Sequence, residues 1–179
     1  MATIALGVTG SIAAYKACTL VRLFVKAGHD VTVVMTEHAK EFVTPLTFRT
    51  LSRNPVESEL FAAPVTWVPG HVSLAERADI VVVAPCTANV MAKMSAGIAD
   101  DLLTSLLLAT RKPILLAPAM NTGMWLNPAT QANYSALAKR GVEFVDMATG
   151  ELACRASGPG RMAEPEAIFE RTSRILKGA

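Results

Sequence analysis

The chain has 179 residues, of which 51% are hydrophobic and 18% charged, so it is long and apolar enough to fold around a buried core. Its net charge of +2 and its lack of any Lys/Arg run exclude the electrostatic pattern of a nucleic-acid-binding protein. No apolar stretch approaches the roughly 18 residues of a membrane span. The mean hydropathy of +0.36 therefore predicts a deeply buried sheet, an oligomer interface or both.

The three cysteines, Cys18, Cys86 and Cys154, form neither a CxxC pair nor a zinc-ligand spacing. An odd number of widely spaced cysteines does not suit a disulfide framework, so we expect a reducing, cytoplasmic location. The N-terminus lacks the basic region of a signal peptide. Cys18 lies on an apolar helical face and Cys86 borders a strand end, and we interpret both as structural.

Apolar runs with strand character alternate with segments of helical periodicity along the whole chain. Gly28 and Gly141 follow two of the helical segments as stop signals, and the run from Ile80 to Val83 has the β-branched composition of a strand buried on both faces. We expect strands over 3–8, 31–35, 79–84, 113–117 and 142–145; helices over 12–27, 37–42, 74–78, 89–95, 101–110, 128–140 and 165–177; short pieces over 45–58; and loops over 62–70 and 147–162.

This alternation predicts a single α/β domain over residues 1–179, with a doubly wound, mostly parallel, Rossmann-like sheet. In such folds ligands bind beyond the carboxyl ends of the strands. Four segments there carry small, hydroxyl or amide residues: 9–12, 35–37, 85–89 and 118–121.

Backbone N–H groups and hydroxyls at helix starts suit a phosphate group. Neither the dinucleotide motif GxGxxG nor the P-loop motif is present, so a mononucleotide is favoured. The structural alternative is that Ser11, Thr36 and Asn89 are helix N-caps only.

Four motifs carry a more specific signal: GSIAAYK (10–16), GHVSL (70–74), PAMNTGMW (118–125), and LAC (152–154) followed by GPGRM (158–162). With these motifs the chain resembles the flavin-dependent cysteine decarboxylase family over nearly its whole length, and most closely the members that decarboxylate 4′-phosphopantothenoylcysteine in coenzyme A biosynthesis. The resemblance implies FMN as cofactor and an assembly of three subunits or of four such trimers.

The resemblance also assigns roles to residues. His71 matches the catalytic base, and Cys154 matches the residue that completes the reductive half of the cycle. Asn121, Met124 and Ala153 match substrate-binding positions, with Asn121 expected to hold the carboxylate of the substrate's terminal cysteine. The positions that match FMN-binding residues are Gly10, Ser11, Ile12, Thr36, Thr87, Ala88, Asn89, Val90 and Ala119.

These residue types suit the implied chemistry. A carboxylate leaves as carbon dioxide only if the remaining electrons have a sink, and oxidation of the thiol carbon to a thioaldehyde creates one. FMN accepts the hydride, an imidazole near neutrality suits a base, and Cys154 would return a proton to the enethiolate. No metal is expected, because Asp100 and Asp101 without a histidine are typical of a helix start.

Each residue also has a structural reading. His71 could be an exposed loop histidine, and Cys154 a packed thiol. Met120, Met124 and Trp125 have the character of core residues, which would make Asn121 between them a buried amide in need of partners.

One position departs from the family pattern, because Arg155 stands where a glycine usually follows the cysteine. Arginine restricts the backbone and lowers the pKa of a neighbouring thiol. A second departure is that no ligase domain, to which many bacterial relatives are fused, follows Lys177 in this sequence.

Three other functions remain open. The first is the oxidative decarboxylation of a peptide's C-terminal cysteine, which releases an enethiol. The enzymes that catalyse this reaction often lack the reducing cysteine. Flavin prenyltransferases share the fold but lack the PAMNxxMW and cysteine-loop patterns. A non-catalytic flavoprotein subunit should lack His71 or Cys154.

Overall fold

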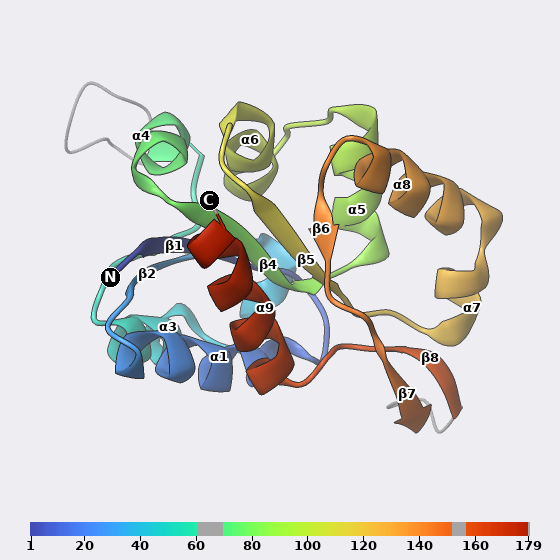
Figure 1. The fold of residues 1–179 in the computed structure, drawn as a ribbon, viewed down its shortest axis with the longest axis horizontal. Coiled ribbons are helices and arrows are strands. Elements are labelled where there is room, and N and C mark those ends of the chain that lie inside the picture. The colour runs from blue at the N-terminus through green and yellow to red at the C-terminus, as the bar shows by residue number, and fades with distance from the viewer. Residues whose placement is uncertain (61–69, 152–156, 179) are drawn as a thin grey trace.

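The computed structural model describes residues 1–60, 70–151 and 157–178 (Figure 1). Its centre is a six-stranded parallel sheet with strand order β3-β2-β1-β4-β5-β6. This order is the doubly wound arrangement expected from the sequence. The strands are β1 (Thr3–Val8), β2 (Asp30–Met35), β3 (Val56–Glu57), β4 (Ile80–Cys86), β5 (Ile114–Pro118) and β6 (Glu143–Phe144).

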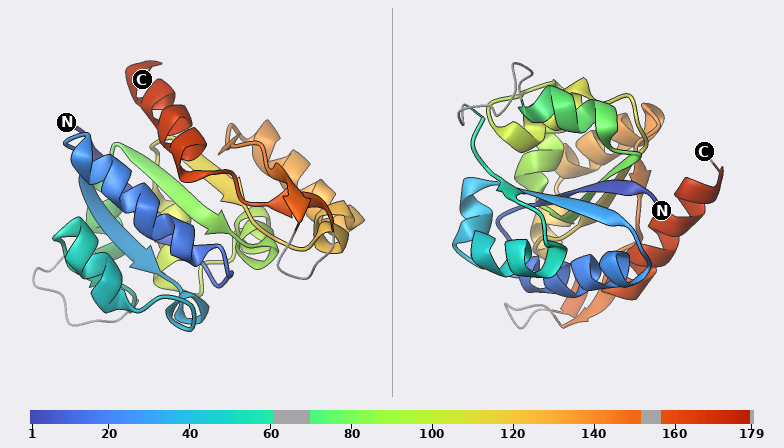
Figure 2. Two further views of the ribbon diagram at one scale, coloured as in Figure 1. Left: turned by 90° about the horizontal axis from the view of Figure 1, so that it is seen from below. Right: turned by 90° about the vertical axis from the view of Figure 1, so that its left-hand side faces the viewer.

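The helices form two layers with the sheet between them, as the right-hand view of Figure 2 shows. Helices α1, α3 and α9 cover one face, and α4, α5, α6 and α8 cover the other (Figure 1). The helices are α1 (Ala14–Lys26), α2 (Glu37–Lys40), α3 (Pro45–Ser52), α4 (Gly70–Arg77), α5 (Ala88–Ala96), α6 (Leu102–Ala109), α7 (Thr122–Leu126), α8 (Pro128–Lys139) and α9 (Pro165–Gly178).

Burial follows the sequence pattern. Every residue of β4 is buried, as its β-branched run predicted. Phe24 and Phe48 fill the core beneath one face, and Leu103 and Leu106 fill the core above the other. Within the described part of the chain, none of the helices has the length and apolar character required to cross a membrane.

The prediction of a loop over 147–162 is wrong for most of its described residues, because β7 (Ala148–Glu151) and β8 (Ser157–Arg161) form an antiparallel hairpin. Glycine and proline are poor strand formers, so the sequence of β8 does not indicate a strand. Pairing with β7 stabilises it. The hairpin extends beyond the sheet on the side of α7 (Figure 1).

Three helical segments also differ from expectation. The segment 45–58 was expected to be broken, yet it contains the eight-residue helix α3, because Pro45 occupies a first-turn position that proline tolerates. The helix expected to begin at residue 74 begins at Gly70, and α7 was not expected. Of the predicted loop over 62–70, residues 62–69 lie outside the described residues.

Candidate functional site

A cavity of about 400 Å³ lies where β1, β2 and β4 end. Residues from three of the four segments expected at the strand ends line it, and its volume falls in the range of small-ligand sites. Six predicted site residues line it: Gly10, Thr36, Thr87, Asn89, Val90 and Met124. The other lining residues are Thr9, Glu37, His38, Lys93, Asp100 and Asp101.

Thr9 holds the cavity's main-chain walls together. Its Oγ1 donates to the carbonyl oxygen of Pro85 at 2.8 Å and accepts from the backbone nitrogen of Thr87 at 3.1 Å. The hydroxyl of this buried residue thereby fixes the end of β1 to the start of α5. Thr9 was not among the predicted site residues. The feature of the sequence that could have indicated its role is its position directly before Gly10.

Gly10 allows the first loop to approach α2 closely. A Cβ atom at this position would lie 2.4 Å from the Cβ of His38 and 3.1 Å from its backbone carbon. No side chain fits in that space, so the glycine sets the close packing of the loop against the cavity wall.

The side chain of Thr36 fits a ligand-binding hydroxyl better than a helix cap. It occupies the N-cap position of α2, yet its side chain makes no capping hydrogen bond. Its Oγ1 is buried without a hydrogen-bond partner, and the residue is only 7% exposed. A buried polar atom in this state calls for a partner that the chain itself does not supply.

The start of α5 offers a second polar group beside Thr36. Thr87 is the N-cap of α5, and its hydroxyl accepts from the backbone nitrogen of Val90 at 3.4 Å. A helix start favours negative charge. The orphaned hydroxyl of Thr36, the glycine loop and this helix start therefore fit the phosphate of a nucleotide cofactor.

The remaining predicted cofactor positions are not among the residues that line this cavity. Ser11 Oγ accepts from the backbone nitrogen of Ala13 at 3.3 Å, so it shapes the turn before α1. Ile12 is 58% exposed, and Ala88 begins α5. Ala119 is buried, and its backbone nitrogen donates to the carbonyl of Cys86 at 3.0 Å.

Two of the charged residues that line the cavity, Lys93 and Asp100, form an ion pair. Lys93 Nζ contacts both carboxylate oxygens of Asp100 at 2.7 and 2.8 Å, and its hydrogen bond holds the pKa of Asp100 below the usual range. Asp101 Oδ1 accepts from the backbone nitrogen of Thr104 at 2.7 Å and caps α6. Among the described residues, no group of three acidic, histidine or cysteine side chains could hold a metal ion.

His71 lies in the first turn of α4 rather than at the end of a loop. Its Nδ1 atom is buried and has no hydrogen-bond partner. His71 is not among the residues that line the cavity, whereas Thr36 is.

Asn121 caps α7, and its Oδ1 accepts from the backbone nitrogen of Gly123 at 2.7 Å. The expectation of a buried amide is wrong, because Asn121 is exposed where the chain leaves the sheet after β5. Met124 is also half-exposed and reaches the cavity, so the segment after β5 leads from the cavity to the surface. Trp125 instead packs edge-on against Tyr134, with ring centroids 5.3 Å apart.

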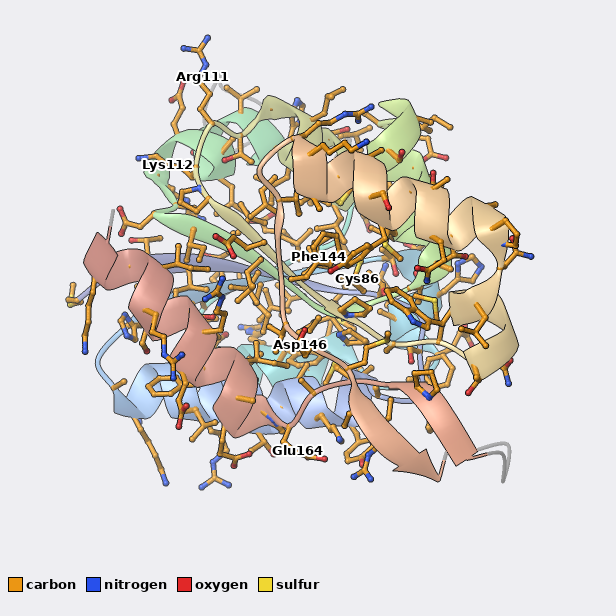
Figure 3. All side chains as sticks on the ribbon, turned by 45° about the vertical axis from the view of Figure 1, so that its right-hand side comes forward. Cys86, Arg111, Lys112, Phe144, Asp146 and Glu164 are labelled. Carbon is orange, nitrogen blue, oxygen red and sulfur yellow. The ribbon has the colours of Figure 1, made fainter. Side chains whose placement is uncertain are left out.

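The described cysteines have no catalytic environment. Cys86 is fully buried at the end of β4 (Figure 3), and this burial raises the pKa of its thiol to about 12. Burial also raises the pKa of Cys18. Cys154, Ala153 and Arg155 lie outside the described residues.

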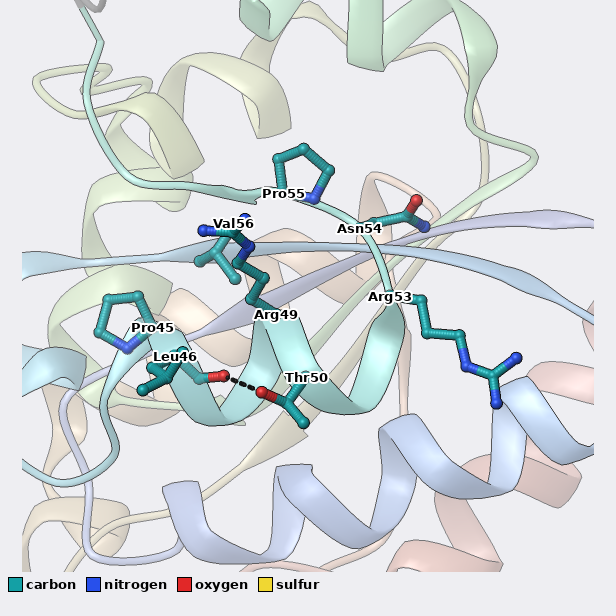
Figure 4. A pocket seen from close by; sticks show the side chains of 8 residues that line it. All are labelled: Pro45, Leu46, Arg49, Thr50, Arg53, Asn54, Pro55 and Val56. Carbon is teal, nitrogen blue, oxygen red and sulfur yellow. Dashed lines mark hydrogen bonds between the residues drawn. The ribbon is translucent and has the colours of Figure 1, made fainter.

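A second hollow, of about 1120 Å³, lies beside the edge strand β3 (Figure 4). None of the predicted site residues that the structure describes lines it. Its one drawn hydrogen bond, from Thr50 Oγ1 to the carbonyl of Leu46 at 2.8 Å, lies within α3. The smaller cavity at the strand ends is therefore the candidate site. The residues that line the hollow are Pro45, Leu46, Arg49, Thr50, Arg53, Asn54, Pro55 and Val56.

The doubly wound sheet and the phosphate-compatible cavity define a nucleotide-binding α/β protein. A family model described as Flavoprotein matches residues 1–177, and the chain belongs to this family. Its cofactor is accordingly a flavin, in agreement with the cavity.

The chain is also similar to curated relatives and to solved structures within this family. The chain is 49% identical over 176 residues to the coenzyme A biosynthesis bifunctional protein CoaBC of Mycolicibacterium smegmatis, covering 98% of this chain and 42% of the relative. It is 52% identical over 171 residues to the CoaBC protein of Mycobacterium bovis, covering 96% of this chain and 40% of the relative. The chain thus spans about two fifths of the length of these curated relatives.

Among solved structures, a PPC decarboxylase mutant complexed with pantothenoylaminoethenethiol has a TM-score of 0.89 and 30% identity, with 99% of each chain covered. The FMN-dependent cysteine decarboxylase SpaF has a TM-score of 0.85 and 27% identity, covering 99% of this chain and 97% of the other. These likenesses confirm the fold and the family resemblance that the motifs predicted.

Proposed function

We propose that the chain binds FMN without a covalent bond and decarboxylates 4′-phosphopantothenoylcysteine to 4′-phosphopantetheine in coenzyme A biosynthesis. The observation that carries the proposal is the unpartnered hydroxyl of Thr36 in a cavity at the strand ends. Two comparisons support it: about half of the aligned positions are identical to CoaBC proteins, and the chain matches a PPC decarboxylase end to end.

FMN, when bound, supplies an acceptor and donor of a hydride, which no side chain provides. Thr36 and the start of α5 hold its phosphate, and the glycine loop with Ser11 and Ile12 shapes the wall beside it. The nearby Ala119 occupies the buried end of β5. These residues bind and orient the cofactor and take no part in bond breaking.

His71, Asn121 and Cys154 act on the substrate. His71 accepts the thiol proton, because an imidazole suits a base near neutrality. The amide of Asn121 donates to the substrate carboxylate, and Met124 lines the path from the cavity to the surface. Once carbon dioxide has left, Cys154, which lies between β7 and β8 in the sequence, donates a proton to carbon, which allows the saturated thiol to form.

The site requires more than one copy of the chain in this proposal. His71 does not line the cavity of its own chain, whereas Met124 does. An assembly of three subunits, or of four such trimers, would let the base of one copy serve the cavity of another. We propose further that residues 1–179 form one flavoprotein domain and that the protein acts in the cytoplasm.

A peptide with a C-terminal cysteine is the second candidate substrate. The end-to-end match to SpaF, a cysteine decarboxylase of 27% identity, favours keeping it. Mass spectrometry of products distinguishes the two functions. The proposed enzyme lowers the mass of 4′-phosphopantothenoylcysteine by one carbon dioxide, whereas a peptide-modifying enzyme removes one carbon dioxide and two hydrogens from a peptide.

Cys154→Ser gives a second test of the same proposal. The variant should still release carbon dioxide but leave a product two hydrogens short, with the flavin reduced until oxygen is admitted. A parent-like yield of saturated thiol from this variant would remove Cys154 from the mechanism. A parent that makes only enethiol would favour the peptide substrate.

A further inference from the structure

Lys16, the last residue of the GSIAAYK motif, is the only charged residue among the described side chains that is buried. It lies in the first turn of α1, and its side chain is 8% exposed. Its Nζ contacts Oε1 of Glu164 at 2.9 Å and lies 3.4 Å from the carbonyl oxygen of Met162. Glu164 is 148 positions away in the sequence and lies between the hairpin and α9 (Figure 3).

Lys16 depends on this ion pair more than Glu164 does, because Lys16 is buried and Glu164 is not. A buried ammonium group is costly unless it is paired and hydrogen-bonded. Glu164 is half-exposed, and the same Oε1 also accepts from Arg161 Nη2 at 2.9 Å. Lys16, with Arg161 in support, holds the pKa of the Glu164 carboxyl below its usual range. Removal of Lys16 would therefore leave Glu164 with Arg161 and water as partners.

On one side, Lys16 is connected by backbone hydrogen bonds to the cofactor loop, which we define as residues 9–12. The backbone nitrogen of Ala14 donates to the carbonyl of Ser11 at 2.9 Å, and that of Lys16 donates to the carbonyl of Ala13 at 3.0 Å. The loop that shapes the cavity and the lysine thus belong to one hydrogen-bonded turn. The backbone of Lys16 is therefore linked to the loop that shapes the cavity wall.

On the other side, the partners of Lys16 directly follow the β7–β8 hairpin. The hairpin in turn contacts the substrate segment, which we define as residues 120–122. Met162 is buried in the core directly after β8. Within β8, the carbonyl of Gly160 accepts from the backbone nitrogen of Met120 at 3.0 Å, and the carbonyl of Pro159 accepts from Thr122 Oγ1 at 2.9 Å. Residues 120–122 include the proposed substrate-binding Asn121.

We propose that Lys16 is a positioning residue, which holds the stem of the β7–β8 hairpin through Met162 and Glu164 and thereby places the substrate-binding segment 120–122 relative to the cofactor loop. The substrate part of this inference rests on the proposed function. Lys16 itself touches no reacting atom.

The test compares flavin-loaded Lys16→Met, Lys16→Arg and parent protein by amide hydrogen exchange with mass spectrometry. Methionine keeps the apolar stem and removes the ammonium group, whereas arginine keeps the charge. We expect exchange in residues 119–122 and 157–161 to be about tenfold faster in Lys16→Met, and unchanged in β4. Lys16→Arg should restore most of the protection. Arg174→Met breaks the exposed Arg174–Glu170 pair and should behave as the parent.

Steady-state kinetics with 4′-phosphopantothenoylcysteine adds a readout that general destabilisation would not give. In Lys16→Met, KM should rise about tenfold with flavin content retained, while kcat changes less, because the substrate must order a loosened segment. Parent-like exchange in Lys16→Met, or equal acceleration in β4, would overturn the proposal. If the parent does not decarboxylate this substrate, the proposed function fails, and the exchange comparison still decides the positioning role.

Discussion

The backbone nitrogen of Met120 donates a hydrogen bond to the carbonyl oxygen of Gly160 at 3.0 Å. This bond joins the PAMNTGMW motif to the GPGRM motif across forty positions of sequence. Gly160 has a φ of +135°, and a Cβ there would lie 2.3 Å from the carbonyl oxygen of Met120. A glycine is therefore required where the hairpin meets the substrate segment.

Thr36→Val should weaken flavin binding. The substitution keeps the side-chain volume and removes the orphaned hydroxyl, which we assign to the cofactor phosphate. Loss of one hydrogen bond to a charged group should reduce affinity by about tenfold to a hundredfold. The flavin-to-protein ratio after purification, followed by titration with FMN, measures the effect.

Thr172→Val is the matched control for Thr36→Val, because Thr172 is also buried but lies on α9, where its hydroxyl donates to the carbonyl of Ile168. It should keep its flavin. If both variants bind flavin as the parent does, Thr36 does not contact the cofactor.

His71→Asn should retain flavin and assembly but lose the oxidative step. Removal of a general base is expected to slow the reaction by about 10²–10⁴. The rate of flavin bleaching after anaerobic addition of substrate reports this step. His29→Asn is the control, since the Nδ1 of His29 is also buried without a partner but lies between α1 and β2. Bleaching at the parent rate in His71→Asn would exclude His71 as the base.

Asn121→Asp should weaken substrate binding without disturbing α7. An aspartate oxygen can still accept from the backbone nitrogen of Gly123, so the helix cap is kept. Its negative charge would repel the substrate carboxylate and raise KM by about tenfold or more. Asn127→Asp is the matched control, because Asn127 caps α8 in the same manner. An unchanged KM in Asn121→Asp would mean that another residue holds the carboxylate.

The Lys16–Glu164 pair should contribute to stability at neutral pH and not in acid. Its hydrogen bond and charge lower the pKa of Glu164, so the contribution is full above the unfolded-state pKa, about 4.3, and is lost as the pH falls through the lower folded-state value. Urea unfolding should show Glu164→Gln less stable than the parent near neutrality, with the two converging in strong acid. A difference that does not shrink on acidification would contradict this assignment.

Much of the fold could be predicted, because its strands are locally distinctive. The β-branched run Ile80–Val83 and the glycines after α1 and α8 mark elements by composition and spacing alone. The stem of the hairpin could not be predicted, because β8 consists of residues that disfavour strands and is stabilised by its pairing with β7 and its contacts with residues 120–122.

The candidate site divides in the same way. Residues that directly follow strands, such as Gly10, Thr36 and Thr87, could be placed from the order of the elements. The exposure of Asn121 and the contact of Lys16 with Glu164 depend on how distant segments pack, which no local pattern encodes. The linking role of Thr9 likewise depends on the path of β4 beside β1.

The most direct test of the account is anaerobic incubation of the flavin-loaded protein with 4′-phosphopantothenoylcysteine, with released carbon dioxide and product mass measured together. We expect one carbon dioxide per substrate consumed, a saturated thiol lighter than the substrate by that carbon dioxide alone, and flavin that ends oxidised. Flavin-loaded protein that leaves the substrate intact and releases no carbon dioxide would contradict it.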